Sequence, residues 1–285
     1  RKKPAARSLN FAMLTRRTAA ATSTSRNHYP FISYNFLHHL LIRNQGMTMR
    51  FGPLVLVPAI LAAVPAMALA GERDFFAGLD VSGGTAFGSS STTDGGAPFA
   101  GGGVVDHVRF GETTGIGGHI GYRFDPAMSI FISYQHIRGD VGWNASFPLF
   151  GVSSRFEGSA VSDMITGNAA YELALSDATA VRATAGLGVT FNKLSGLVET
   201  DRATGLFLAD VAGHTKISPV AQVGTGVRYK FTPSAVLGLD ASVAYAGGFE
   251  TGTTRSGNLG ITDINPYKID DVWRANLGAS ISFQF

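Results

Sequence analysis

The last fourteen residues, Val272 to Phe285, constrain the fold of this chain more than any other stretch. Odd positions from Trp273 to Phe285 are apolar or small, and even positions from Arg274 to Gln284 are polar or glycine. Such alternation predicts a strand with one apolar and one polar face, because successive side chains point to opposite sides. The strand exceeds the roughly 5–6 residues of a globular strand and reaches the roughly 9–11 that a tilted strand needs to cross a bilayer. The alternative, an edge strand of a soluble sandwich, would leave a long apolar edge open to aggregation.

Seven upstream segments show the same alternation, and we expect each to form a strand. They span about residues 75–87, 114–124, 128–140, a segment that ends near 175, 179–191, 217–231 and 235–247. Three short turns (125–127, 176–178 and 232–234) alternate with four long polar connections (88–113, 141–155, 193–216 and 249–270). Transmembrane barrels show this asymmetry, with short periplasmic turns and long extracellular loops. The sequence therefore predicts an all-β fold, an eight-stranded antiparallel up-and-down transmembrane β-barrel over residues 71–285, with its termini in the periplasm.

Residues 47–70 have the features of a secretory signal peptide. Arg50 supplies the positive end, Leu54 to Val64 the apolar run, and Ala68 to Ala70 a cleavage site of small residues. A transmembrane helix is the alternative, but three prolines interrupt the apolar run and no basic flank follows it. We therefore expect cleavage after Ala70.

Residues 1–46 account for the basic character of the chain. Of the 23 Lys and Arg residues, nine lie within residues 1–70, which contain no Asp or Glu. Residues 71–285 contain the other 14 together with all 20 Asp and Glu, so their net charge is −6. Nucleic-acid binding is therefore not supported for residues 71–285. We interpret residues 1–46 as sequence upstream of a start at Met47 or Met49, with an organellar-type presequence as the alternative.

Aromatic residues gather at both ends of the expected strands, as in the two interfacial girdles of membrane barrels. Near the short turns they are Tyr122, Phe124, Tyr171, Tyr229, Phe231, Phe283 and Phe285; near the long connections they are Tyr134, Phe191, Tyr245 and Trp273.

Six charged residues fall on the inward faces of the expected strands, in the half nearer the short turns. They are Asp80, Arg123, Glu172, Arg182, Arg228 and Asp240. Glu172 and Arg182 flank Asp177 symmetrically, so a hairpin should set them opposite each other. We expect a bidentate contact between this pair and a lumen filled by its own charges. Separate residues solvated in a hydrated lumen are the alternative.

Two hairpin segments carry a resemblance to a known group of proteins. GIGGHIGYRFDPAMSIFISYQHI (Gly115–Ile137) and GTGVRYKFTPSAVLGLDASVAY (Gly224–Tyr245) share a glycine-rich strand, an aromatic-basic-Phe end, a Pro turn and an alternating return. This pattern resembles the hairpins of bacterial eight-stranded outer-membrane barrels, of the opacity-protein group and of the transmembrane domain of outer membrane protein A. The resemblance implies that Phe283 and Phe285 act as the assembly signal for the barrel assembly machinery. It also implies contact with outer-membrane lipid and lipopolysaccharide.

The chain offers few parts for catalysis or metal binding. Cysteine is absent, and the expected mature chain has four histidines, His107, His119, His136 and His214. His107 and His214 are interpreted as solvated loop residues and His119 as a hydrogen-bonded lumen residue, because the sequence offers no His-x-Ser pair of the lipid A deacylase kind. The acidic loop residues show no EF-hand spacing. We expect no catalytic site, no cofactor and no metal.

Three functions remain possible for such a barrel, since architecture alone does not specify a role. The function we expect is the first, a surface protein with a structural or interaction role through four extracellular loops and without catalysis, whose extracellular ligand the sequence does not identify; the other two are alternatives. The second is a narrow pore for small solutes, and the third is an enzyme that modifies outer-membrane lipid.

Overall fold

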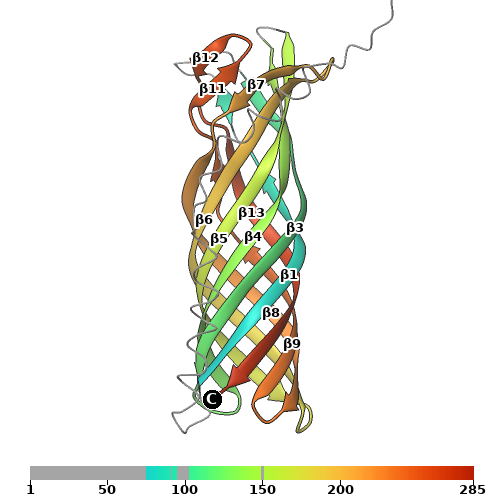
Figure 1. The fold of residues 1–285 in the computed structure, drawn as a ribbon, viewed down its shortest axis with the longest axis vertical. Coiled ribbons are helices and arrows are strands. Elements are labelled where there is room, and N and C mark those ends of the chain that lie inside the picture. Colours follow the sequence, from blue (N-terminus) through green and yellow to red (C-terminus); the bar gives the residue numbers. More distant parts are fainter. Residues whose placement is uncertain (1–74, 91, 95–102, 149–150) are drawn as a thin grey trace, which may run out of the picture. The chain divides into compact units, whose positions relative to one another are not determined.

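The computed structural model describes residues 75–90, 92–94, 103–148 and 151–285, so the expected signal peptide and upstream segment lie outside the described residues. Eight long antiparallel strands form the body of this part of the chain (Figure 1). They are β1 (Phe75–Ser89), β3 (Gly103–Arg123), β4 (Met128–Phe147), β5 (Val152–Ala174), β6 (Thr179–Asp201), β8 (His214–Thr232), β9 (Ala235–Tyr245) and β13 (Lys268–Gln284). No helix in this part is long and apolar enough to cross a membrane.

The eight strands close into a ring. Each long strand pairs with the next along the chain, β6 pairs directly with β8, and β13 returns to pair with β1 from Phe76 opposite Gln284 onward. Closure leaves no edge in the ring, so the backbone groups of every long strand find partners inside the sheet. The predicted eight-stranded antiparallel up-and-down barrel is confirmed.

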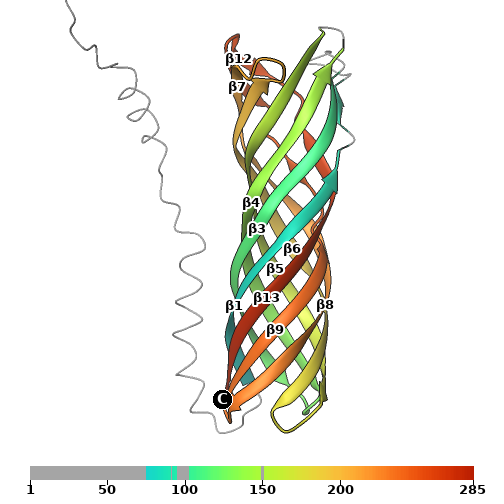
Figure 2. The same cartoon turned by 90° about the vertical axis from the view of Figure 1, so that its right-hand side faces the viewer.

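The three short turns lie together at the end of the barrel where the chain ends (Figures 1 and 2). In the first turn the Asp125 carboxylate accepts hydrogen bonds from the backbone N–H groups of Ala127 and Met128, at 2.7 and 2.8 Å. In the second, the Ser176 hydroxyl accepts from the N–H groups of Ala178 and Thr179, at 3.3 and 3.1 Å. These side chains replace backbone partners in the turn, which is why Asp and Ser recur there.

The prediction of four long polar connections at the other end is wrong in extent. Strand structure continues through most of three of them: β3 begins at Gly103, β4 runs to Phe147, β5 begins at Val152 and β6 runs to Asp201. Beyond the ring, β7 (Phe207–Val211), β11 (Thr254–Gly257) and β12 (Gly260–Asp263) extend the sheet from β6. The remaining strands are two-residue pieces, β2 (Thr93–Asp94) and β10 (Phe249–Glu250).

A reversal of the apolar face explains why these strand extensions escaped prediction. In the first half of β4, Met128, Ile130 and Ile132 face outward and are 48–59% exposed. In the second half the alternation continues, but the residues of the opposite parity are apolar and point inward: Trp143 is fully buried and Phe147 is 8% exposed. Bulges in β3 and β6 further interrupt the two-residue period there. The wall thus changes from apolar outside to apolar inside.

An apolar core fills the barrel at this end; we call it the upper core. Its buried members are Ala86, Val105, Val141, Trp143, Ala145, Phe147, Phe156, Ala160, Leu194, Leu197, Val211, Phe249, Ile264, Tyr267, Ile269 and Val272. The rings of Trp143 and Phe156 stack with centroids 5.3 Å apart and planes 6° apart. Such close packing of apolar side chains is typical of a protein interior.

Candidate functional site

The lumen near the short turns holds the six charged residues expected there, but their pairing differs from the expectation. Glu172 stands opposite Arg182 in the register of β5 and β6. Their closest charged atoms are 3.8 Å apart, and Arg123 lies 3.5 Å from the other Glu172 oxygen. Arg182 instead rests on the face of Phe131, 4.5 Å from the ring centroid. The expected bidentate contact between Arg182 and Glu172 is therefore wrong.

The bidentate pair of the lumen is Arg228 with Asp240. Its two N–H···O distances are 2.8 and 2.9 Å, and Arg228 also donates to the Ser280 hydroxyl at 3.3 Å. Arg228 lies on β8 and Asp240 on the adjacent strand β9, in diagonal rather than directly opposite positions of the ladder. Two parallel hydrogen bonds to one carboxylate give the strongest geometry that an ion pair adopts.

The sixth charge, Asp80, pairs with a histidine rather than with an arginine, which the sequence analysis missed. The His119 Nδ1 atom lies 2.9 Å from Asp80 Oδ2, and its Nε2 atom lies 2.8 Å from the Ser282 hydroxyl. The three residues come from β3, β1 and β13, so they join the first and last strands of the ring to a third strand. Asp80 and His119 are 39 positions apart in the sequence, so local spacing could not indicate this contact.

The distances in this Asp80–His119–Ser282 triad match those of a nucleophile, its base and an orienting acid. Acyl transfer also needs N–H donors aimed at a developing oxyanion. The backbone around Ser282 is paired with β1 on one side and β9 on the other. His119 is 4% exposed and lies between the rings of Phe76 and Phe131. The arrangement therefore supports hydrogen bonding across the closing strands of the ring.

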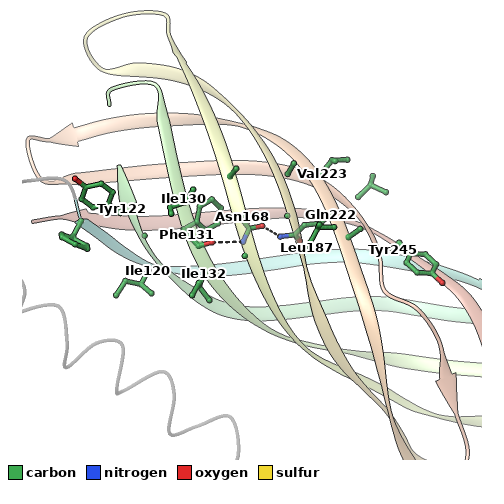
Figure 3. A pocket seen from close by; sticks show the side chains of 18 of the residues that line it. Ile120, Tyr122, Ile130, Phe131, Ile132, Asn168, Leu187, Gln222, Val223 and Tyr245 are labelled. Carbon is green, nitrogen blue, oxygen red and sulfur yellow. Dashed lines mark hydrogen bonds between the residues drawn. The ribbon is translucent and has the colours of Figure 1, made fainter. Parts of the chain in front are cut away.

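A polar layer without charges follows in the middle of the barrel. Asn168 donates to the Ser133 and Thr166 hydroxyls at 3.1 Å, and its own amide oxygen accepts from Gln222 at 2.6 Å (Figure 3). Beyond it, Ile137, Met164, Val220 and Ala244 form a small apolar cluster, which we call the middle cluster.

Arg274 lies between the middle cluster and the upper core. Its side chain is 3% exposed, and it donates to the Ser162 hydroxyl through Nη2. No carboxylate of the described residues pairs with it, and its Nε and Nη1 atoms have no acceptor there. This buried, uncompensated cation was not singled out from the sequence; its place on the polar face of the last strand was the only signal.

The outer wall nearer the short turns is apolar and exposed. Large apolar side chains there include Ile132 at 59%, Val223 at 61%, Leu239 at 67% and Leu187 at 71% exposure. Small residues of β5, β6 and β8 leave a groove of about 1140 Å³, which Ile132, Leu187 and Val223 line, with Tyr122 and Tyr245 at its ends (Figure 3).

The aromatic residues assigned to the girdles lie at both borders of this wall. Tyr171, Tyr229 and Phe231 are 45–54% exposed near the short turns, and Trp273 is 49% exposed at the other border, where its ring packs against Tyr245 with centroids 5.4 Å apart. Of the two residues of the expected assembly signal, Phe283 is 41% exposed and Phe285 is 9% exposed. The Phe285 N–H donates to the Phe75 carbonyl at 3.0 Å.

Comparison with known proteins adds similarity of fold. No family model and no curated protein matches the chain. Among solved structures it is similar to Neisserial surface protein A (NspA), with 16% identity, a TM-score of 0.40, and coverage of 74% of this chain and 97% of that chain. It is also similar to the outer membrane protein OprG from Pseudomonas aeruginosa, with 14% identity, a TM-score of 0.42, and coverage of 75% of this chain and 96% of that chain. A third similar structure is the outer membrane protease OmpT from Escherichia coli, with 9% identity, a TM-score of 0.32, and coverage of 75% of this chain and 98% of that chain.

This chain has the fold of the small outer-membrane β-barrels. The resemblance of its hairpins to that group is confirmed at the level of the fold, which the ring of eight strands shows directly. The identities and TM-scores carry no argument about its activity, so its role has to be inferred from its own residues.

Proposed function

We propose that this protein is a surface protein of the bacterial outer membrane, with a barrel that is closed to solutes and a binding role outside the membrane. The apolar wall between the two aromatic borders supports the membrane location, because a soluble monomer rarely exposes a continuous apolar patch of more than a few hundred Å². Outer-membrane lipid and lipopolysaccharide would cover this wall and fill its groove. The short turns would face the periplasm, and the upper core would lie on the extracellular side.

The upper core is the observation that carries the proposal. Sixteen buried apolar residues occupy the lumen where a pore would need water, and the middle cluster and the charged layer lie beneath them. An eight-stranded barrel is just wide enough for side chains to fill its interior. A closed lumen favours a structural or interaction role over the narrow pore.

A small sheet at the extracellular end offers the binding surface. Strands β7, β11 and β12 continue the barrel wall, and β12 is the last strand of the sheet, so one of its edges has no partner strand among the described residues (Figure 1). Leu259, just before this strand, is 81% exposed, and Ile261, within it, is 77% exposed. Leu206 is 66% exposed. An open edge with apolar side chains binds an extended segment of another protein, which adds a strand through backbone hydrogen bonds.

The test compares bacteria that display the protein with bacteria that display variants. Leu259→Asp combined with Ile261→Asp should reduce retention of the cells on a surface coated with extracellular-matrix protein by about tenfold, the effect of ~1.4 kcal/mol. Val152→Asp, at an exposed apolar position of another connection, serves as the matched control. Heat-dependent gel mobility verifies equal amounts of folded barrel.

Two results would contradict the proposal. One is a steady ohmic current through the pure protein in a planar bilayer, which would favour the pore. The other is equal retention of the double variant, the control and cells without the protein, which would remove the binding role.

A further inference from the structure

The uncompensated cation inside the barrel has no role in the proposed surface function. Arg274 is 3% exposed, and a charge removed from water to this degree is costly unless it is paired and hydrogen-bonded. Arg228 has Asp240 at 2.8 Å, and Arg255 has Glu199 at 2.6 Å. Arg182, 4% exposed, also leaves two of its nitrogen atoms without an acceptor among the described residues, but it still has the Glu172 carboxylate at 3.8 Å. Arg274 differs in having no carboxylate partner among the described residues.

The Ser162 hydroxyl, which Arg274 contacts, belongs to a network of hydrogen bonds. Ser162 accepts from Arg274 Nη2 and donates its own proton to the amide oxygen of Asn192. That oxygen also accepts from Thr190, and the amide nitrogen of Asn192 donates to the carbonyls of Ala246 and Gly248, at 2.7 and 3.0 Å. The network therefore holds the Nη2 atom of Arg274 in place, and Nε and Nη1 have no acceptor among the residues that the structure describes.

The register places small residues opposite Arg274 on both neighbouring strands. Arg274 stands opposite Ala86 of β1 and Ala244 of β9, which are 4% and 1% exposed. Ala86 belongs to the upper core and Ala244 to the middle cluster. Arg274 thus lies between two apolar layers. Its neighbours on both adjacent strands are alanines, which have the smallest side chains that still carry a Cβ.

We propose that Arg274 holds a small monovalent anion, chloride in the cell, inside the barrel. One negative charge neutralises the guanidinium, and the free N–H groups supply charge-assisted donors for it. A divalent or bulky anion fits this place in the lumen less well, because the apolar layers on either side of Arg274 contain no second cation that would balance a larger charge. The anion completes the filling of the lumen at the level between the two apolar layers. This inference does not depend on the proposed surface function.

Equilibrium unfolding in urea tests the site, because an anion that binds only the folded barrel stabilises it by mass action. Chloride is replaced stepwise by gluconate at constant ionic strength. Above the dissociation constant, each tenfold increase in chloride should raise the folding equilibrium constant about tenfold. In Arg274→Met this dependence should vanish. Arg138→Met, which removes an exposed arginine of β4, should retain it and so measures general salt effects.

Crystals of the unmodified protein grown in bromide give a second measurement that does not rely on any variant folding. An anomalous peak beside the Arg274 guanidinium supports the site. The proposal is overturned if folding is independent of chloride and no bromide peak appears, which means that water alone meets the donors. It is also overturned if Arg274→Met keeps the full chloride dependence.

Discussion

The Arg228–Asp240 and Glu172–Arg182 pairs differ in geometry, so their loss should differ in cost. Asp240→Asn breaks a bidentate contact and leaves Arg228, 8% exposed, without its charge partner, at about 3–5 kcal/mol of unfolding free energy. Glu172→Gln, at distances of 3.5 and 3.8 Å from its arginines, should cost about 1–3 kcal/mol. Urea unfolding in lipid or detergent measures both, with Asp177→Asn in an exposed turn as the control.

A double variant distinguishes a coupled lumen from a hydrated one. If Glu172 and Arg182 interact, changing Arg182 to Met in the Glu172→Gln background should recover part of the loss, because contacting residues are not additive. Strictly additive losses would instead indicate that each charge is solvated separately.

The Asp80–His119–Ser282 triad should respond as a structural contact. His119→Leu removes the partner of Asp80 and should lower the free energy of unfolding by about 1–3 kcal/mol, whereas Ser282→Ala should cost about 1 kcal/mol. A fluorophosphonate probe, which labels activated serines, should leave the folded protein unmodified. Labelling that disappears in both Ser282→Ala and His119→Leu would mean that the triad is catalytic.

At the scale of the strands, the reversal of the apolar face marks where the wall leaves the membrane. Ile132 and Asp140 share the outward face of β4, eight residues apart, which corresponds to about 26 Å of strand. Ile132→Arg should destabilise the barrel by about 2–4 kcal/mol, the cost of a cation facing lipid near the middle of the bilayer, and Asp140→Arg by less than about 1 kcal/mol. Equal costs at the two positions, measured by unfolding from lipid vesicles, would place the whole strand in one environment.

The same reversal shows what the sequence could and could not predict. A two-residue period, counted along both strands from a short turn, predicts the strand segments near the short turns. It also predicts that Glu172 and Arg182 stand opposite each other. That count assumes apolar residues outside, an assumption that fails at Val141, Trp143 and Phe147, where the apolar side is the inside. Arg274 and His119 were visible as polar-face residues, but their surroundings depend on the register between distant strands.

The upper core should behave as a packed protein interior at the element scale. Trp143→Ala removes a fully buried ring stacked on Phe156 and should cost about 3–5 kcal/mol. Trp143→Phe should cost less, because it keeps a ring and removes an indole N–H that has no acceptor among the described residues. Trp273→Phe, on the exposed wall, is the control for loss of a tryptophan signal. A small effect of Trp143→Ala would show that this end of the lumen is loosely packed.

Across the whole molecule, the lumen is obstructed by successive layers of different chemistry, from the charged layer through the polar layer and the middle cluster to the upper core. Opening one layer should therefore leave the barrel closed. Trp143→Ala with Phe156→Ala should lower stability but still give no steady current in a planar bilayer, because Ile137 and Met164, 1% and 2% exposed, remain beneath them. The variant must first be shown to be folded by its heat-dependent gel mobility. A steady current after this change alone would mean that the upper core is the only barrier and that the layers below it conduct ions, in which case the barrel would be a gated pore.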